Sequence, residues 1–132
     1  MDTKNRVTIP SEWLEAEESK FFAIPNAHNE FLVVMPIEEF DQMEATIRAS
    51  PASAQEKRIA IRQFYGAAHA ITADKQGRIL LLDEYCKRTE LSGEVMIVGS
   101  RSRFEIWNYA RWNAATEAEA PIYQKVADLI GL

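Results

Sequence analysis

The sequence is poor in the residues that build disulfide frameworks and metal centres. It contains one cysteine, Cys86, and two histidines, His28 and His69, which are far apart in the chain. A single thiol excludes an intramolecular disulfide and suits a reducing compartment. Neither histidine has a cysteine or carboxylate at metal-ligand spacing beside it. We therefore expect no metal, no cofactor and a cytoplasmic location.

Long apolar runs and catalytic motifs are also lacking. The longest apolar runs have four or five residues, as at 31–35, whereas a membrane span needs about 20. Residues 1–18 are polar and acidic, which does not resemble a signal peptide. No P-loop, nucleophile elbow or Gly-rich dinucleotide turn is present. The sequence predicts neither a membrane protein nor an enzyme, and no small-molecule substrate is expected.

Positive charge is in deficit, with 15 Lys and Arg against 20 Asp and Glu and a net charge of −5. This balance argues against a free-standing nucleic-acid binder of the usual basic kind. However, the charges are segregated along the sequence. Acidic residues gather at 12–18, 38–44 and 117–119, and basic ones at 4–6, 57–62, 75–78, 87–88 and 101–103. This segregation permits a basic face on an acidic protein.

An internal repeat is the most informative feature that is present. Residues 2–13 align with 74–85, and residues 32–40 align with 104–112, both at an offset of 72. Two separated blocks at one offset indicate two homologous modules. We assign a first module at 1–50 and a second at 67–132. A linking helix at 51–66 joins them, and its start is marked by a capping-box pattern from Ser53 to Glu56. The first module lacks a strand before its turn, whereas the second has one at 67–73.

Each module shows the same order of elements. A polar turn leads into a short apolar strand, a helical turn, a β-hairpin and a helix. The hairpin strands are expected at 21–24 and 31–35 in the first module, and at 95–98 and 103–107 in the second. The closing helices are expected from 37 to 50 and from 108 towards Pro121, with a separate last helix at 121–130. The sequence predicts an α+β fold with a β-barrel-like core and peripheral helices.

The turn Asp74-Lys75-Gln76-Gly77-Arg78 resembles the Asp-x-x-Gly-Arg turn of AbrB-like, swapped-hairpin DNA-binding proteins. Two such turns, with the trailing blocks 36–40 and 106–112, resemble the MraZ family over nearly the whole chain. The resemblance implies a double-split β-barrel built from two tandem AbrB-like modules. It also implies homo-oligomeric rings that bind double-stranded DNA. The implied function is a nucleoid-associated transcriptional regulator that contacts tandem promoter repeats in the division and cell-wall gene cluster.

The candidate DNA-binding residues lie in the two turns. We assign the base contact to Arg6, because a planar guanidinium can bond guanine through two hydrogen bonds. The residues expected to support it are Lys4, Thr3 and Asn5, with Arg78 and Lys75 in a lesser role. The residues expected to organise the turns are Asp2, Asp74 and Gly77. Asn5 stands where the family has Gly, but Asn tolerates a positive φ, so the turn geometry is expected to survive.

Several alternatives remain open. Asp2 with Arg6, and Asp74 with Arg78, could be ion pairs that only fix the loops. The chain could be an oligomeric protein-interaction module with degenerate DNA binding, or an antitoxin-like regulator of the same fold. Because one small turn binds DNA feebly at physiological salt, the DNA-binding hypothesis needs several copies acting together.

Overall fold

The computed structural model describes residues 1–14 and 19–132. Residues 15–18, part of the acidic run noted at 12–18, lie outside the described residues. The elements of the described chain, in order, are β1 (Arg6–Thr8), the 3-10 turn η1 (Ser11–Trp13), β2 (Lys20–Pro25), β3 (Phe31–Pro36), α1 (Ile37–Arg48), α2 (Ala54–Ala67), β4 (His69–Thr72), β5 (Arg78–Leu80), α3 (Asp83–Arg88), β6 (Val95–Ser100), β7 (Arg103–Asn108) and α4 (Tyr109–Ile130).

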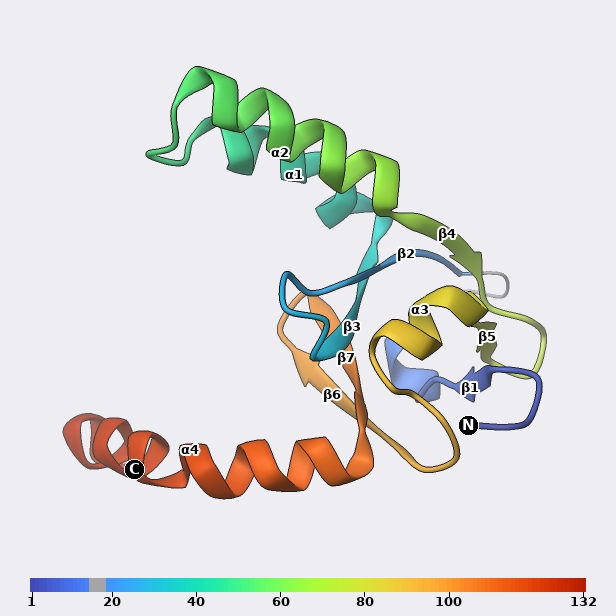
Figure 1. Ribbon diagram of the computed structural model, residues 1–132. Helices are drawn as coiled ribbons and strands as arrows, with labels where there is room; N and C mark the ends of the chain where they lie inside the picture. The colour runs from blue at the N-terminus through green and yellow to red at the C-terminus, as the bar shows by residue number, and fades with distance from the viewer. Residues whose placement is uncertain (15–18) are drawn as a thin grey trace.

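The strands form two antiparallel sheets (Figure 1). A five-stranded sheet has the order β4-β2-β3-β7-β6, and a separate two-stranded ribbon pairs β1 with β5. The expected α+β class is confirmed. Within the described residues no strand pairing joins the ribbon to the larger sheet.

The register of both sheets carries the 72-residue repeat. Val7 pairs with Ile79 at the centre of the β1–β5 ribbon, and Val33 pairs with Glu105 where β3 meets β7. In both pairs the two residue numbers differ by 72, so each pair lies at a local pseudo-twofold axis between equivalent strands. The same relation makes β6 the counterpart of β2. β4 covers the outer edge of β2, and no strand in the described chain covers the corresponding edge of β6.

One hydrophobic core holds the ribbon against the sheet. Side chains alternate along β2, with Phe21 and Ala23 buried and Phe22 and Ile24 half-buried on the other face. The core combines residues of the five-stranded sheet with Val7 and Ile9, which precede η1, and with their repeat partners Ile79 and Leu81. Its members from the sheet include Leu32, Val34, Ile71, Phe104 and Ile106. Burial of this apolar surface is the main source of stability. It fixes the ribbon, and therefore the turns at its ends, relative to the sheet.

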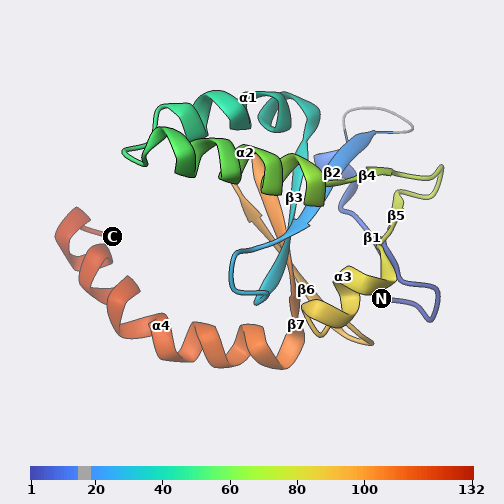
Figure 2. The same ribbon diagram turned by 45° about the horizontal axis from the view of Figure 1, so that its top comes forward.

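The helices α1 and α2 form a hairpin at one end of the sheet (Figures 1 and 2). The ring of Phe40 stacks on Phe22 at 3.6 Å between centroids, and the Tyr65 hydroxyl donates to the Phe40 carbonyl. The capping box predicted from Ser53 to Glu56 is confirmed, with both reciprocal hydrogen bonds present.

The sequence interpretation of Pro121 was wrong. A break was predicted there, with separate helices on either side, but α4 is one helix of 22 residues that contains Pro121. Proline removes one backbone hydrogen bond and clashes with the preceding turn, which bends a helix without always ending it. Figure 2 shows the red C-terminal part of α4 turned away from the direction of its first half. The first turns pack on the sheet, where the Trp112 ring meets Trp107 edge to face.

Candidate nucleic-acid interface

The carboxylate of Asp2 closes the first turn. Its Oδ1 accepts hydrogen bonds from the backbone N–H groups of Lys4 and Arg6, each at 2.9 Å. Its Oδ2 accepts a third hydrogen bond from the Arg6 Nε at 2.7 Å. The Asn5 backbone has a φ of 60°, in the left-handed region that Asn tolerates better than most residues. Asp2 therefore fixes both the loop backbone and the orientation of the Arg6 guanidinium.

The second turn repeats this arrangement. The Oδ1 of Asp74 accepts from the backbone N–H groups of Gln76 and Arg78 at 2.9 Å, and Arg78 Nε donates to Oδ2 at 3.0 Å. Gly77 has a φ of 75°. A Cβ at this position would approach Leu14 Cδ1 to 3.2 Å, so both backbone and space favour glycine.

Each turn is tied to the other half of the chain. The Ile9 N–H donates to the Gly77 carbonyl at 2.8 Å, and the Leu81 N–H donates to the Asn5 carbonyl at 2.9 Å. The two bonds are equivalent under the 72-residue offset. The interlocked pairing means that distortion of one turn is transmitted to the strand that leaves the other.

The turn carboxylates are held in their charged form. Hydrogen bonds from the Arg6 backbone and side chain lower the pKa of Asp2, and the equivalent bonds from Arg78 lower the pKa of Asp74. Because each carboxylate neutralises part of its arginine, the turns are not bare cationic loops. The intra-turn ion pairs between Asp2 and Arg6 and between Asp74 and Arg78 are thus present in the structure.

The ion pairs leave the outer ends of the guanidinium groups available. In both arginines the bond to aspartate uses Nε, and within residues 1–14 and 19–132 the terminal nitrogens of Arg6 and Arg78 have no hydrogen-bond partner. Their side chains are 32% and 29% exposed. Lys4, Thr3 and Lys75 are exposed at the tips. Each turn can thus donate hydrogen bonds to an external acceptor from a guanidinium that is already oriented. A neighbouring lysine or threonine side chain can donate further bonds.

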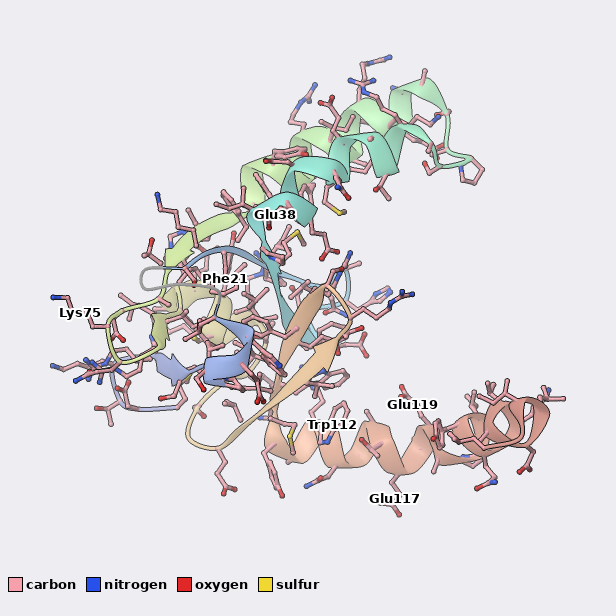
Figure 3. The ribbon with its side chains drawn as sticks, turned by 180° about the vertical axis from the view of Figure 1, so that it is seen from behind. Phe21, Glu38, Lys75, Trp112, Glu117 and Glu119 are labelled. Atoms are coloured by element: carbon pink, nitrogen blue, oxygen red, sulfur yellow. The ribbon has the colours of Figure 1, made fainter. Side chains whose placement is uncertain are left out.

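Both turns project from the same edge of the molecule, away from α1, α2 and α4 (Figures 1 and 2). Figure 3 shows Lys75 reaching out from this edge. The turns carry four cationic and two anionic side chains, a net charge of +2 against −5 for the whole chain. A two-stranded ribbon with cationic ends has dimensions that the major groove of DNA admits. This edge is the candidate interface.

One part of the interface was not predicted from the sequence. The Asn5 side chain donates to Asp83 Oδ1 at 3.2 Å, and Asp83 also pairs with Lys87 at 3.0 Å on α3. These two donors lower the pKa of Asp83, the Lys87 bond most of all. The one indication in the sequence is that Asn5 of the first turn stands where the second turn has Gly77. Unlike glycine, Asn5 has a side chain that can reach α3.

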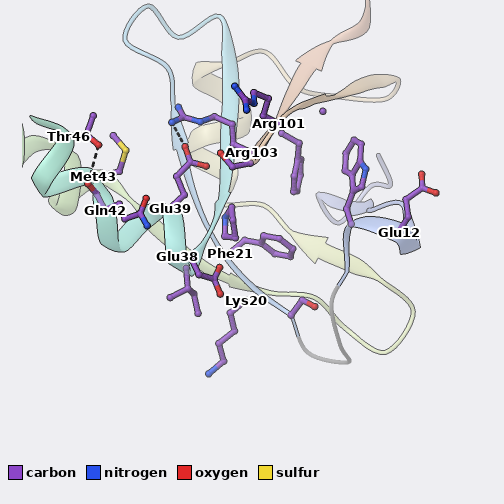
Figure 4. Close-up of a pocket in the computed structure, with 17 residues that line it drawn as sticks. Glu12, Lys20, Phe21, Glu38, Glu39, Gln42, Met43, Thr46, Arg101 and Arg103 are labelled. Atoms are coloured by element: carbon purple, nitrogen blue, oxygen red, sulfur yellow. Dashed lines mark hydrogen bonds and ion pairs between the residues drawn. The ribbon is translucent and has the colours of Figure 1, made fainter.

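A cavity of about 1050 Å³ lies between η1, α1 and the turn from β6 to β7 (Figure 4). Trp13, Phe21 and Phe104 line it, and an ion pair between Arg103 and Glu39 crosses its wall. Figure 3 places Phe21 and Glu38, which line the cavity, apart from Lys75 at the turn edge. The cavity is therefore a separate feature from the candidate interface.

Other chemistry-bearing residues do not assemble into a site. Burial raises the pKa of the Cys86 thiol to about 11, which keeps it protonated and unreactive. Residues 1–14 and 19–132 contain no group of three His, Cys, Asp or Glu side chains that could hold a metal ion. In the same part of the chain, no helix combines the length and apolarity needed to cross a membrane.

Comparison with known proteins identifies the family. Residues 64–132 match the model of a family described as "MraZ protein, putative antitoxin-like". A protein of Carboxydothermus hydrogenoformans named "Transcriptional regulator MraZ" is 34% identical over 97% of this chain and 89% of its own length. Proteins of the same name from Heliobacterium modesticaldum and Desulfitobacterium hafniense strain DSM 10664 are each 33% identical, over 97% and 100% of this chain and 89% and 92% of their own lengths. Matches of this extent, on a chain with two equivalent Asp–Arg turns, show that the chain belongs to the MraZ family.

Proposed function

We propose that this protein is a sequence-specific, DNA-binding transcriptional regulator that contacts tandem promoter repeats through the turns at 2–6 and 74–78. Its relatives named above are called transcriptional regulators, and none of those names describes an enzyme. The observation that carries the proposal is the pair of equivalent turns on one edge, each with the outer end of its guanidinium unpaired within the described residues.

In this proposal Arg6 reads a base and its neighbours hold the register. A guanidinium that is already oriented by Asp2 loses less side-chain entropy when it bonds guanine O6 and N7. Lys4 and Thr3 contact phosphate oxygens, which contribute affinity without sequence information. Asn5 shapes the turn and connects it to α3. Arg78 and Lys75 of the second turn contribute further contacts to the phosphate backbone of the DNA.

The proposal includes assembly into homo-oligomers. If the four turn cations of one copy all met phosphates, the logarithm of affinity would fall with that of salt concentration with a slope of about −3.6. One copy is then a weak binder at physiological salt, more so with a net charge of −5. A ring of copies on tandem repeats gains by effective concentration, about 10²–10⁴-fold. The double-split barrel and a cytoplasmic, nucleoid-associated location belong to the same proposal.

A second candidate is a protein-interaction module in which the turns no longer bind DNA. The net negative charge and the intra-turn ion pairs favour it. The two candidates differ in whether the protein binds DNA specifically and with a steep dependence on salt.

The decisive experiment is fluorescence anisotropy with a labelled duplex from upstream of the gene and a scrambled duplex of equal composition. We expect tight, salt-sensitive binding to the first alone between 50 and 200 mM salt, in the range where phosphate contacts give large losses. Arg6→Ala should abolish the preference. Arg48→Ala is the matched control, since Arg48 is exposed and pairs only with Glu44 on α1 among the described residues. Absence of salt-sensitive binding to either duplex by the unmodified protein would reject the proposal in favour of the interaction module, and equally tight binding to both would reject sequence-specific recognition.

A further inference from the structure

The first turn has a polar side chain at a position where the second turn has none. Asn5 has a φ of 60°, and the equivalent residue of the second turn is Gly77, with a φ of 75°. The residue of α3 that bonds Asn5 is Asp83, and at the offset of 72 it corresponds to Ser11. The contact between turn and helix therefore belongs to the first turn alone, which lies beside α3 (Figures 1 and 2).

Asp83 determines which way the amide group of Asn5 faces. The Asn5 Nδ2 donates to Asp83 Oδ1 at 3.2 Å. Hydrogen bonds from Lys87 and then from Asn5 lower the pKa of Asp83, so this carboxyl group is charged at neutral pH. A charged carboxylate only accepts hydrogen bonds, and the amide oxygen also only accepts them. The amide nitrogen must therefore face Asp83, and the oxygen is turned away from it.

The rest of this amide group is available to a ligand. Its nitrogen carries two hydrogens, and within residues 1–14 and 19–132 the bond to Asp83 is the one hydrogen bond that the Asn5 side chain makes. In the same part of the chain, Glu39 Oε2 is the one buried side-chain nitrogen or oxygen without a partner, so Asn5 Oδ1 is accessible. Asn5 thus offers one acceptor and one donor from a single planar group next to Arg6.

This pair of groups matches the major-groove edge of adenine. Phosphate oxygens, guanine O6 and N7 and thymine O4 only accept hydrogen bonds, so none of them can bond the amide oxygen. Adenine N6 and cytosine N4 can donate to it. Adenine also presents the acceptor N7 beside N6, which the second N–H of the amide can bond, whereas cytosine would leave that N–H without a partner.

We infer that Asn5 reads an adenine in the base pair next to the guanine read by Arg6, and that Asp83 is the positioning residue for this contact. Consecutive Cα atoms are about 3.8 Å apart, close to the spacing of about 3.4 Å between base pairs, so neighbouring residues can reach neighbouring pairs. The inference rests on the proposed function and deepens it by naming a second base and the residue that reads it.

The test measures fluorescence anisotropy with a series of promoter duplexes in which each base pair of one repeat is replaced in turn. Asn5→Gly gives the first turn the residue that the second turn has, and glycine accepts the positive φ. Asp83→Ala removes the positioning carboxylate. Its matched control is Glu84→Ala, which removes an exposed carboxylate from the next residue of the same helix. Circular dichroism gives the thermal midpoint of each variant.

We expect the unmodified protein to prefer A·T at one position beside the guanine by about 5- to 150-fold, the range for one bidentate contact. Asn5→Gly should lose this preference and keep both the guanine preference and the salt slope. Asp83→Ala should weaken the adenine preference, because the amide is then free to turn, and should have no further effect on it when combined with Asn5→Gly. Glu84→Ala should bind like the unmodified protein.

Modified bases test the same contact without changing the protein. At the adenine position, 7-deazaadenine lacks the N7 acceptor and purine lacks the N6 amino group. Each should weaken binding by the unmodified protein and have no effect on binding by Asn5→Gly. A loss of this kind cannot arise from a folding defect.

Three results would overturn the inference. The first is an unchanged set of base preferences in Asn5→Gly while Arg6→Ala loses its preference, which leaves the proposed function standing. The second is a preference for cytosine, instead of adenine, that Asn5→Gly removes. The third is an equal effect of Asp83→Ala and Glu84→Ala, which would reject the positioning role. Absence of specific binding by the unmodified protein would reject the proposed function itself, and this inference with it.

Discussion

Replacing Arg6 with lysine separates base reading from charge. Arg6→Lys keeps the positive charge, but an ammonium cannot form the two parallel hydrogen bonds that a guanidinium makes with guanine. One such pair provides about 1–3 kcal/mol of discrimination, or roughly 5- to 150-fold in affinity. We therefore expect the preference for the promoter duplex to fall by this factor, while affinity for a scrambled duplex changes little.

Arg6→Lys is also expected to leave the folding of the turn almost unchanged. The bond from Arg6 Nε to Asp2 joins two side chains that are each about a third exposed, at 32% and 37%. Ion pairs this open to solvent contribute little to stability, and the two backbone hydrogen bonds to Asp2 do not involve the Arg6 side chain. Folding should therefore be almost unaffected, and a change in DNA preference can be assigned to the interface.

The comparison variant is Lys4→Ala, which removes a charge from the exposed tip of the same turn. If Lys4 contacts phosphate, its loss weakens binding to every sequence and reduces the magnitude of the salt slope by about 0.9 for each engaged turn. The assay is anisotropy over a salt series with both duplexes. Arg6→Lys retaining full preference, or lowering affinity for both duplexes equally, would refute the assignment of base reading to Arg6.

Three further predictions concern the fold that carries the turns. Gly77→Ala should destabilise the protein by about 1–3 kcal/mol in chemical denaturation, because φ is 75° and the new Cβ would press on Leu14. Ser53→Ala should cost about 1 kcal/mol, seen as a thermal midpoint lower by about 4 °C, since it removes the cap of α2. The lowered pKa values of Asp2 and Asp74 stabilise the fold above their ordinary value of 3.8, and this contribution is lost as pH falls through the lower folded values. In measurements from pH 5 to pH 2, the thermal midpoint should therefore begin to decrease below about pH 4. The decrease should be less steep in a variant with both Asp2 and Asp74 changed to Asn.

The local parts of the architecture followed from the sequence because their signals are local. The capping box at Ser53 and the hairpin strands expected at 21–24 and 31–35 required only neighbouring residues. The repeat added long-range information, because an offset of 72 relates strands that pair across a pseudo-twofold axis. Val7 with Ile79 and Val33 with Glu105 are its direct expression in the register.

The parts that sequence reasoning missed depend on tertiary contacts. The link from Asn5 to Asp83 joins residues 78 positions apart. Asn5 departs from the glycine of the repeat, but neither segment predicts that its side chain contacts α3. The helix boundary predicted at Pro121 is absent, because α4 continues through this residue. The cavity between η1, α1 and the β6–β7 turn combines segments from both halves of the chain, so its existence depends on how the modules interlock.

The two turns share their framework but not their tips, and this bears on the kind of operator the protein can read. At the offset of 72, Thr3 corresponds to Lys75 and Lys4 to Gln76, so the pseudo-twofold axis relates unequal contacts. A symmetric dimer matches a palindrome because its halves are identical. This chain presents an asymmetric pair instead, and a homo-oligomer of the kind proposed above, if its copies join head to tail, would repeat that pair in one orientation from copy to copy. Direct repeats, spaced by the distance between neighbouring copies, are the arrangement of sites that such an assembly would occupy with the same contacts at every copy.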